Sequence, residues 1–367
     1  MRDVDLLKIS LITLLEKNYG CLLQAFASQE KFKELGCEFE FINFIRRRSQ
    51  SFRLLLEWGK ANPVKMGVLL PSYLRWISVM QTFKRNYLQL SPVFYESEEA
   101  LTGYPLDADI YCTGSDQVWN SSLLKGVEYP FYLSFIPSGK RKISFAASFG
   151  KNSVSELDVE QTKELIHQYE CISVRENSGI KILKEQYAYT RAIQIVDPTL
   201  TLPPEFWRGY APKNKIKQPY ILIYTLNKYD GLDDYVRKLS NKTGLCLVRL
   251  CTQYHQALKI GKSILIPDIF EFITLIDNAD YTLTDSFHAT AFSMALNTEP
   301  ICIGRNNSRV RDLLQMLESQ HRSIKNFQDL EALNQPSDFA RINEILKRER
   351  EKADKFLKNI IHNGAVL

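Results

Sequence analysis

The amino-acid sequence predicts an α/β protein made of two doubly wound, Rossmann-like domains that face a cleft. Three observations lead to this prediction. The chain has 367 residues, more than a single domain usually contains. Short apolar segments typical of strands alternate with segments of helical periodicity, as in a parallel sheet covered by helices. A loop rich in proline and lysine, residues 202–219, separates two such series.

The first series, residues 1–205, begins with a strand that is followed by a helix. Leu7–Leu14 is predicted to be the strand, and Gly20–Leu35 a helix that ends at Gly36. The strands that follow are nearly continuously apolar, which is typical of strands buried on both faces. They are predicted at residues 39–45, 109–113, 142–147, 171–174 and 193–196.

The second series, residues 215–367, repeats this alternation with a shorter set of strands. Strands are predicted at residues 220–226, 245–251, 281–284 and 301–304. A charged segment of helical periodicity, from about residue 338 to 361, closes the chain and is expected to cross back to the first domain.

The net charge of +5 is concentrated in one insert, residues 46–95. Between residues 46 and 90, nine lysines and arginines face one acid, Glu57, so the domains themselves are near neutral or acidic. This argues against nucleic-acid binding. Aromatic and aliphatic residues interleave with these cations and leave two interpretations open. The insert is either a helical subdomain packed inward, or a basic amphipathic segment that lies on an anionic membrane surface.

The remaining composition excludes several classes of protein. Seven scattered cysteines form no C-x-x-C pair, which favours reduced, buried thiols over disulfides or a zinc site. The N-terminus lacks the pattern of a signal peptide, and no apolar run approaches the roughly 20 residues that cross a bilayer. We therefore expect a cytoplasmic protein, with a peripheral contact to the cytoplasmic membrane face left open.

Ligands of open α/β sheets bind beyond the carboxyl ends of the strands, so the residues that follow each predicted strand are the candidates for function. The first candidate is Asn18, Tyr19 and Gly20, after the first strand. Gly20 permits close approach of the backbone, and the helix that starts there offers free N–H groups to an anion. A plain turn between strand and helix would explain the same residues.

The second candidate lies within residues 113–120 and consists of Ser115, Asp116, Gln117, Trp119 and Asn120. Asp116 could act as a base, Trp119 could stack on a sugar ring, and the others could form hydrogen bonds. An aspartate helix cap beside a buried tryptophan is the structural alternative.

The third candidate is Arg175, at a strand end, where a guanidinium would suit a carboxylate or a phosphate. A surface pair with the neighbouring glutamate is the alternative. The fourth consists of Asp285, Ser286, His288 and Thr290, between a strand and a helix. Histidine suits proton transfer near neutral pH, and the adjacent Asp285 could orient it or act as a base.

The order of these segments resembles that of the polysaccharide pyruvyl transferases. The resemblance extends from about Lys8 to Arg311 and rests on the segments "NYGCLLQAFA", "DIYCTGSDQVWN", "RKISFAASFG", "CISVRENSG", "IVDPTL" and "ADYTLTDSFHATAFS". It implies a GT-B-like fold, with an acceptor side in the first domain and a donor side in the second. It also implies transfer of a pyruvyl group from phosphoenolpyruvate, a co-substrate, to two hydroxyls of a sugar as a ketal. Such acceptors are units of capsular polysaccharides, exopolysaccharides or other bacterial surface glycans, often still attached to a carrier lipid.

One departure from the family pattern concerns the late motif. Members with Arg-x-His at this point use the arginine to hold the anionic donor, whereas this chain has Ser286 there and keeps His288. Arg175 matches the family's other arginine. Arg305 or Arg309 is a candidate to replace the missing cation.

The resemblance assigns roles to the candidate residues. His288 would protonate the donor, Arg175 would clamp an anion, and Asp116 or Asp285 would act as the base or orient the histidine. The scheme calls for no metal and no cofactor. Two alternatives stay open: a glycosyltransferase that uses a nucleotide sugar, and a non-catalytic glycan-binding protein.

Overall fold

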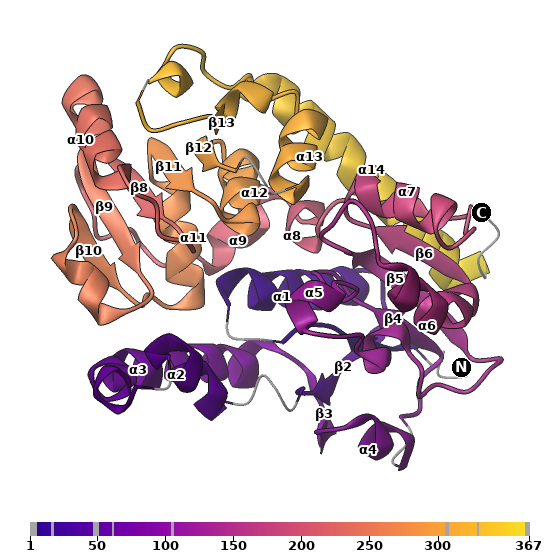
Figure 1. The fold of residues 1–367 in the computed structure, drawn as a ribbon. Helices are drawn as coiled ribbons and strands as arrows, with labels where there is room; N and C mark the ends of the chain where they lie inside the picture. The colour runs from indigo at the N-terminus through magenta and orange to yellow at the C-terminus, as the bar shows by residue number, and fades with distance from the viewer. Residues whose placement is uncertain are drawn as a thin grey trace. The chain divides into compact units, whose positions relative to one another are not determined.

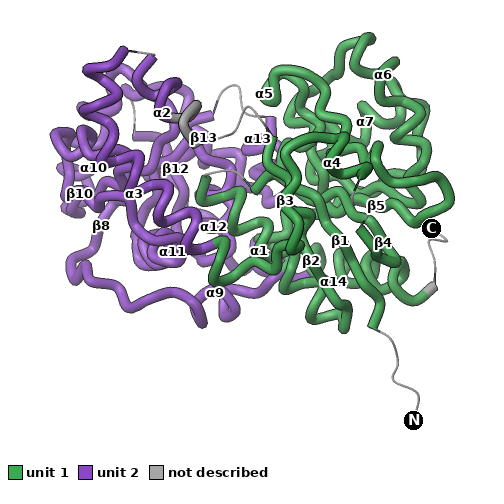
Figure 2. The backbone as a smooth tube through the Cα atoms, turned by 90° about the horizontal axis from the view of Figure 1, so that it is seen from below, with its two compact units in different colours: residues 1–50, 84–201, 348–367 green, residues 51–83, 202–347 purple. Residues whose placement is uncertain are grey.

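A computed structural model describes residues 6–15, 18–46, 51–60, 62–103, 106–304, 308–328 and 330–363, without the side chains of 51–54 and 363. The chain divides into two compact units, shown in Figure 2. Unit 1 comprises residues 1–50, 84–201 and 348–367, and unit 2 comprises residues 51–83 and 202–347. The chain therefore passes between the units more often than the expected limits of 1–205 and 215–367 imply.

Unit 1 is built on a parallel sheet of seven strands in the order β3-β2-β1-β4-β5-β6-β7 (Figure 1). Five of the strands are apolar and mostly buried, in agreement with the predicted segments, because helices cover both faces of a parallel sheet. The strands are β1 (Lys8–Ile12), β2 (Glu38–Phe44), β3 (Leu90–Tyr95), β4 (Ile110–Thr113), β5 (Arg141–Ala147), β6 (Cys171–Val174) and β7 (Ile193–Gln194).

The helices of unit 1 follow its strands in alternation, as the sequence predicts. They are α1 (Tyr19–Glu34), α4 (Glu98–Gly103), α5 (Ser121–Leu124), the 3₁₀ helix η2 (Tyr129–Tyr132), α6 (Glu156–His167), α7 (Asn177–Glu185) and α8 (Pro198–Thr201). The C-terminal helix α14 (Phe339–Asn363) begins in unit 2, and its residues from 348 onward belong to unit 1. Within unit 1, Asp354 of α14 pairs with Lys31 of α1 at 2.5 Å.

Unit 2 has a parallel sheet of six strands in the order β10-β9-β8-β11-β12-β13. Its strands are β8 (Tyr220–Tyr224), β9 (Cys246–Cys251), β10 (Lys262–Leu265), β11 (Tyr281–Thr284), β12 (Glu299–Ile303) and β13 (Ser323–Ile324). Its other elements are α9 (Pro204–Tyr210), α10 (Leu232–Thr243), η3 (Tyr254–Leu258), α11 (Ile269–Asp277), α12 (Phe287–Leu296), α13 (Ser308–Met316), η4 (Gln320–Arg322) and η5 (Glu331–Leu333).

The predicted linker, residues 202–219, contains helix α9, whose Trp207 is fully buried against Phe292 of α12 at a ring distance of 4.9 Å. Part of the linker is therefore packed into unit 2. The basic insert also forms helices, α2 (Ser51–Gly59) and α3 (Pro63–Tyr87). Among the described residues, no helix combines the length and the apolar character needed to cross a bilayer.

In both sheets the order of the strands reverses between two central strands, and this topology positions the candidate residues. In unit 1 the strand order reverses between β1 and β4, and in unit 2 between β8 and β11. At such a reversal, the chain segments that follow the two neighbouring strands turn to opposite sides of the sheet. The carboxyl ends of these strands therefore border a crevice. Asn18–Gly20 and Asp116 follow β1 and β4, and Asp285–His288 follow β11.

A buried lysine in β5 should make stability depend on pH. Lys142 is 1% exposed, and its Nζ donates to the Leu133 carbonyl at 3.0 Å and to Gln168 Oε1 at 2.6 Å. Burial lowers the pKa of Lys142 to about 8. A lowered pKa means that the unfolded chain binds more protons between pH 8 and the ordinary lysine value, so stability rises with pH in that window.

Comparison with Lys142→Met isolates this contribution, because methionine does not titrate. The difference in unfolding free energy, wild type minus variant, should increase by up to about 1.4 kcal/mol per pH unit above pH 8. Urea denaturation at several pH values measures it. A difference that stays constant from pH 7 to 10 would contradict the lowered pKa.

Candidate functional site

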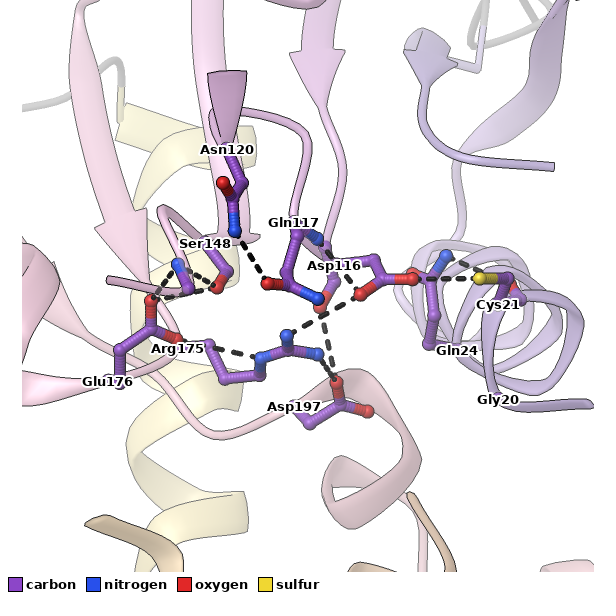
Figure 3. A network of polar contacts seen from close by, with 12 residues as sticks. Gly20, Cys21, Gln24, Asp116, Gln117, Asn120, Ser148, Arg175, Glu176 and Asp197 are labelled. Atoms are coloured by element: carbon purple, nitrogen blue, oxygen red, sulfur yellow. Dashed lines mark hydrogen bonds and ion pairs between the residues drawn. The ribbon is translucent and has the colours of Figure 1, made fainter. Parts of the chain in front are cut away.

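The first turn of α1 lies beside the loop that follows β4. Asn18 caps the helix, and its side chain accepts a hydrogen bond from the Gly20 N–H at 2.8 Å. The helix continues with Tyr19, which is fully buried, and Cys21, whose Sγ donates to Asp116 Oδ2 at 2.8 Å (Figure 3). The first and second predicted candidates are thus brought together by the reversal of strand order between β1 and β4.

Asp116 has an unusual backbone conformation at the centre of this cluster. Its φ of +72° lies in the left-handed region, which aspartate tolerates better than most residues because its short polar side chain bonds locally. Its Oδ1 accepts from the Gln117 N–H at 2.9 Å, and the residue is 5% exposed. Backbone strain of this kind is often found at functional sites.

Arg175 follows β6 and is surrounded by carboxylates (Figure 3). One terminal nitrogen donates to Asp197 Oδ2 at 2.6 Å, the other lies 3.5 Å from Asp116 Oδ1, and Nε lies 3.7 Å from Glu176 Oε2. The side chain is only 2% exposed. Burial by itself lowers the pKa of the guanidinium, but Asp197, Asp116 and Glu176 together raise it above its usual value.

This charge balance differs from that of an anion clamp. Arg175 contacts three buried acids, so its positive charge is already balanced and is not available to attract a carboxylate or a phosphate. The predicted clamping role of Arg175 has no support in this geometry, and the surface Arg–Glu pair considered as its alternative is wrong because both residues are buried. The contacts instead make Arg175 a residue that positions the Asp116 carboxylate.

Glu176 also fixes the opposite side of the cluster. Its Oε1 accepts from Ser148 Oγ at 2.7 Å and from the Gly150 N–H at 3.2 Å. Gly150 has a φ of +60°, and a Cβ there would collide with Gln117 Oε1. Glycine is favoured at this position, because it adopts a positive φ without strain and leaves the Gln117 amide in place. The loop after β5 is thereby held against the segment after β6 that carries Arg175 and Glu176.

The other predicted residues of the second candidate are mostly structural. Trp119 is 2% exposed, its Nε1 donates to the Phe131 carbonyl at 3.0 Å, and its ring stacks on Tyr132 at 5.7 Å. The expectation that Trp119 stacks on a sugar is therefore not met, because the ring is enclosed in the aromatic core. Asn120 caps α5 and donates to Gln117 Oε1 at 2.8 Å.

Ser115 is fully buried, and its hydroxyl donates to Asp197 Oδ2 at 3.3 Å, so it belongs to the support of the cluster. Gln117 is only partly buried, and its amide lies at the centre of the network in Figure 3. Of the residues predicted in the second candidate, Gln117 is partly accessible and Asp116 has a strained backbone. Both properties are typical of residues in binding sites.

In unit 2, Asp285 anchors a loop. Its Oδ1 accepts from the Leu226 N–H at 2.6 Å, and its Oδ2 accepts from the Asn227 N–H at 3.0 Å, Asn227 Nδ2 at 2.8 Å and Tyr229 Oη at 2.9 Å. These bonds join the segments that follow β8 and β11, at the strand reversal of this sheet. They leave the predicted roles of Asp285, base or partner of His288, without support.

Replacing Asp285 by asparagine should therefore affect stability. The variant loses a charged acceptor of four hydrogen bonds, and bonds to charged groups contribute about 1.5–3 kcal/mol. We expect the unfolding free energy to fall by about this amount. Urea denaturation measures the change, and Asp230→Asn in the same loop region is a control that should behave like wild type. An unchanged stability would refute the anchoring role.

The N-terminus of α12 holds the rest of the late motif. Ser286 caps the helix and accepts from the Ala289 N–H at 3.3 Å, and His288 in the first turn is 6% exposed. Thr290 is fully buried and donates to the Ser286 carbonyl at 3.0 Å, so it is a helix residue and does not face a substrate.

One of the two candidates for the missing cation lies close to this helix end. The guanidinium carbon of Arg309, in α13, is 5.7 Å from the centre of the Phe287 ring, and the rings of Phe287 and His288 are 5.2 Å apart. Arg305 lies outside the described residues. Among the described residues, no group of histidine, cysteine and acidic side chains has the arrangement of a metal site.

Cys21, Glu176 and Asp197 complete the cluster around Asp116 and Arg175 but are not among the site residues predicted from the sequence. Asp197 follows β7, so the rule that ligands lie beyond strand ends could have identified it. Cys21 lies in the first turn after β1 and was grouped with the other buried thiols. Its contact with Asp116 joins residues 95 positions apart, which no local pattern shows.

Comparison with known sequences identifies one family. The family model described as polysaccharide pyruvyl transferase matches residues 18–307, well over half of the chain. No curated protein matches the sequence.

Comparison with solved structures identifies the fold. A putative UDP-N-acetylglucosamine 2-epimerase from Listeria monocytogenes superimposes with a TM-score of 0.55 at 10% identity, covering 98% of this chain and 97% of that one. The Neisseria meningitidis UDP-GlcNAc 2-epimerase gives 0.52 at 10% identity, covering 96% and 98%. The spinosyn forosaminyltransferase SpnP gives 0.50 at 11% identity, covering 97% and 99%. At these identities the likeness shows the fold alone, which is GT-B-like and confirms the predicted class.

Proposed function

Because the chain belongs to the polysaccharide pyruvyl transferase family, we propose that it transfers a pyruvyl group from phosphoenolpyruvate to two hydroxyls of a sugar unit. The acceptor is a unit of a bacterial capsular polysaccharide, exopolysaccharide or other cell-surface glycan, still attached to its carrier lipid, and the protein works in the cytoplasm. The observation that carries the proposal is the position of His288 in the first turn of α12, with Arg309 beside Phe287.

The donor binds, in this proposal, at the N-terminus of α12 in unit 2. The positive end of the helix dipole favours an anion, and Arg309 supplies the cation that Ser286 lacks. His288 donates a proton to the methylene carbon of phosphoenolpyruvate, which leaves a cationic centre on the neighbouring carbon. Phosphoenolpyruvate is the only co-substrate, and the scheme calls for no metal or cofactor.

The two C–O bonds of the ketal then form in succession. The first sugar hydroxyl adds to the cationic carbon and gives up its proton. Phosphate leaves with the electron pair of its C–O bond, and the second hydroxyl closes the ring and gives up its proton. One of these protons restores the acid form of His288, and the other leaves with phosphate or solvent, so atoms and charges balance.

Unit 1 supplies the acceptor side in this proposal. Asp116 is held in place by Cys21, the Gln117 N–H and Arg175, and its carboxylate is the group best suited to take a hydroxyl proton. The surplus of acids in this cluster suits hydroxyls better than it suits the anionic donor. The helix start at Asn18–Gly20 and the amide of Gln117 are the remaining candidates for sugar contacts.

Arg309 provides a specific test of the donor site. Arg309→Ala should raise the KM for phosphoenolpyruvate about tenfold or more while changing kcat less, because a positioning cation contributes mainly to binding. Arg311→Ala, on the same helix and paired with Asp312, is the matched control. Equal KM values in the two variants would exclude Arg309 from the donor site.

The experiment that tests the function is phosphate release from phosphoenolpyruvate in the presence of purified glycan-lipid acceptors. The proposal expects release that depends on the acceptor, together with a product heavier by the pyruvyl group. Release of a nucleoside diphosphate from a nucleotide sugar would instead indicate a glycosyltransferase. Acceptor binding without any released phosphate would indicate a non-catalytic glycan-binding protein.

A further inference from the structure

The first half of α3 exposes several large aliphatic side chains to solvent. Val64 is 77% exposed, Val68 69%, Leu70 41% and Leu74 58%. We call these four residues the α3 apolar face. Exposed aliphatic residues are common singly, but four within eleven residues of one helix form a patch of the kind that marks an interaction surface.

The four side chains share one side of the helix. Around the helix axis, at 3.6 residues per turn, the four positions lie within an arc of about 160°, with Leu70 and Val68 at its two ends. Gly67 and Pro71, which are also exposed, lie in the middle of this arc. The opposite side carries Tyr73, Trp76 and Met80, which are buried in unit 2. One side of the helix therefore packs on unit 2, and the other side is exposed to solvent.

A second apolar segment adjoins this helix. The Tyr254 N–H, at the start of η3, donates to Ser72 Oγ of α3 at 2.8 Å. The same 3₁₀ helix ends at Leu258, which is 92% exposed, more than any other large hydrophobic residue described. The exposed apolar surface of unit 2 thus combines two elements that lie far apart in the sequence.

The charges that border this surface are mainly positive. Lys65 is the only charged residue from 62 to 74, Lys60 precedes α3, and Lys259 follows Leu258. Arg75, the first charged residue after this stretch, is paired with Asp268 at 3.0 Å. An aliphatic centre with a cationic border is complementary to a bilayer whose headgroups are anionic. Two copies of this chain that met through the same face would bring these lysines together.

We propose that the α3 apolar face and Leu258 dock unit 2 on the surface of an anionic lipid membrane. The aliphatic side chains enter the boundary between headgroups and acyl chains, and Lys60, Lys65 and Lys259 contact the headgroup phosphates. The contact is peripheral and reversible. It does not depend on the proposed transferase activity, and its test uses neither phosphoenolpyruvate nor a glycan.

Co-sedimentation of the full chain with vesicles tests the proposal. We expect binding to phosphatidylcholine vesicles that contain phosphatidylglycerol and little binding to phosphatidylcholine alone. Val68→Asp and Leu258→Asp should each lower the partition coefficient about tenfold or more, because each removes apolar burial and adds a repelled charge. Lys65→Glu should lower binding only to the anionic vesicles. Leu157→Asp, on α6 of unit 1 and 61% exposed in wild type, is the matched control and should bind normally.

Three results would overturn the proposal. The first is no binding to anionic vesicles by the wild-type chain. The second is an equal loss of binding in Leu157→Asp and Val68→Asp. The third is a dimer in solution that Val68→Asp converts to a monomer, since the face would then bind a second copy. All substituted positions are exposed, and thermal unfolding of each variant should match that of wild type.

Discussion

Arg175→Ala should lower the unfolding free energy by about 3–5 kcal/mol, the usual cost of removing one partner from a buried ion pair. The guanidinium contacts Asp116, Glu176 and Asp197, which are 5%, 2% and 1% exposed. Without it, three buried carboxylates lose the positive charge that they share, or must take up protons to stay buried. Urea denaturation followed by circular dichroism measures the loss.

Two further variants separate charge from geometry. Arg175→Lys keeps the charge but cannot contact all three acids with a planar fork, so it should recover only part of the loss. Arg341→Ala is the matched control, because Arg341 also pairs with two carboxylates, Glu318 and Glu344, but on the surface. Exposed pairs contribute little, so its stability should stay near that of wild type. A similar stability for Arg175→Ala and Arg341→Ala would show that the buried acids do not depend on Arg175.

His288→Ala should reduce turnover of phosphoenolpyruvate at least 100-fold or so, while the fold stays intact. A positioned acid typically contributes about 10²–10⁴-fold to a rate, and the proposed mechanism assigns this proton transfer to His288 alone. The imidazole is 6% exposed, so the substitution to alanine leaves a small cavity. His288→Gln, which fills this space without titrating near neutral pH, keeps the packing and tests the chemistry alone.

Acceptor-dependent phosphate release gives the rate, and thermal unfolding shows whether the fold is retained. His255→Ala is the matched control, because His255 lies on η3 and is exposed. Partial desolvation of the imidazole, together with Lys228 and Lys259, lowers the pKa of His255, so this imidazole stays neutral near pH 7. Normal turnover in His288→Gln would exclude His288 as the acid, whereas normal turnover in His255→Ala is expected.

The central strands could be predicted from the sequence, because burial on both faces makes them continuously apolar. The predicted segments at 109–113, 171–174 and 281–284 correspond to β4, β6 and β11. The strands that sequence reasoning missed, β3, β10 and β13, all lie at sheet edges. An edge strand is covered less completely, so β3 retains exposed Val93 and Phe94 and contains a proline, and the apolar signal is lost.

The basic insert shows the same limit of prediction from sequence. Its alternation of aromatic residues and cations predicted either inward packing or a membrane-facing segment, and in the structure one side of α3 is buried while the other is exposed. Tyr73, Trp76, Met80 and Phe83 pack inward, whereas the α3 apolar face does not. Periodicity shows that a helix has two sides but not which side the rest of the protein covers, because that depends on residues such as Tyr254, far along the chain.

The sequence alone determined the α/β class, the two parallel sheets and the strand ends at which polar residues gather, because these follow from local periodicity and burial. It also identified Asp116, Arg175 and His288 as the residues of interest. Only the tertiary structure decided their partners. It placed three carboxylates around Arg175, directed Asp285 to the loop after β8 and enclosed Trp119 in the core. These contacts join residues tens of positions apart, and their energies depend on burial and distance, which no local pattern in the sequence specifies.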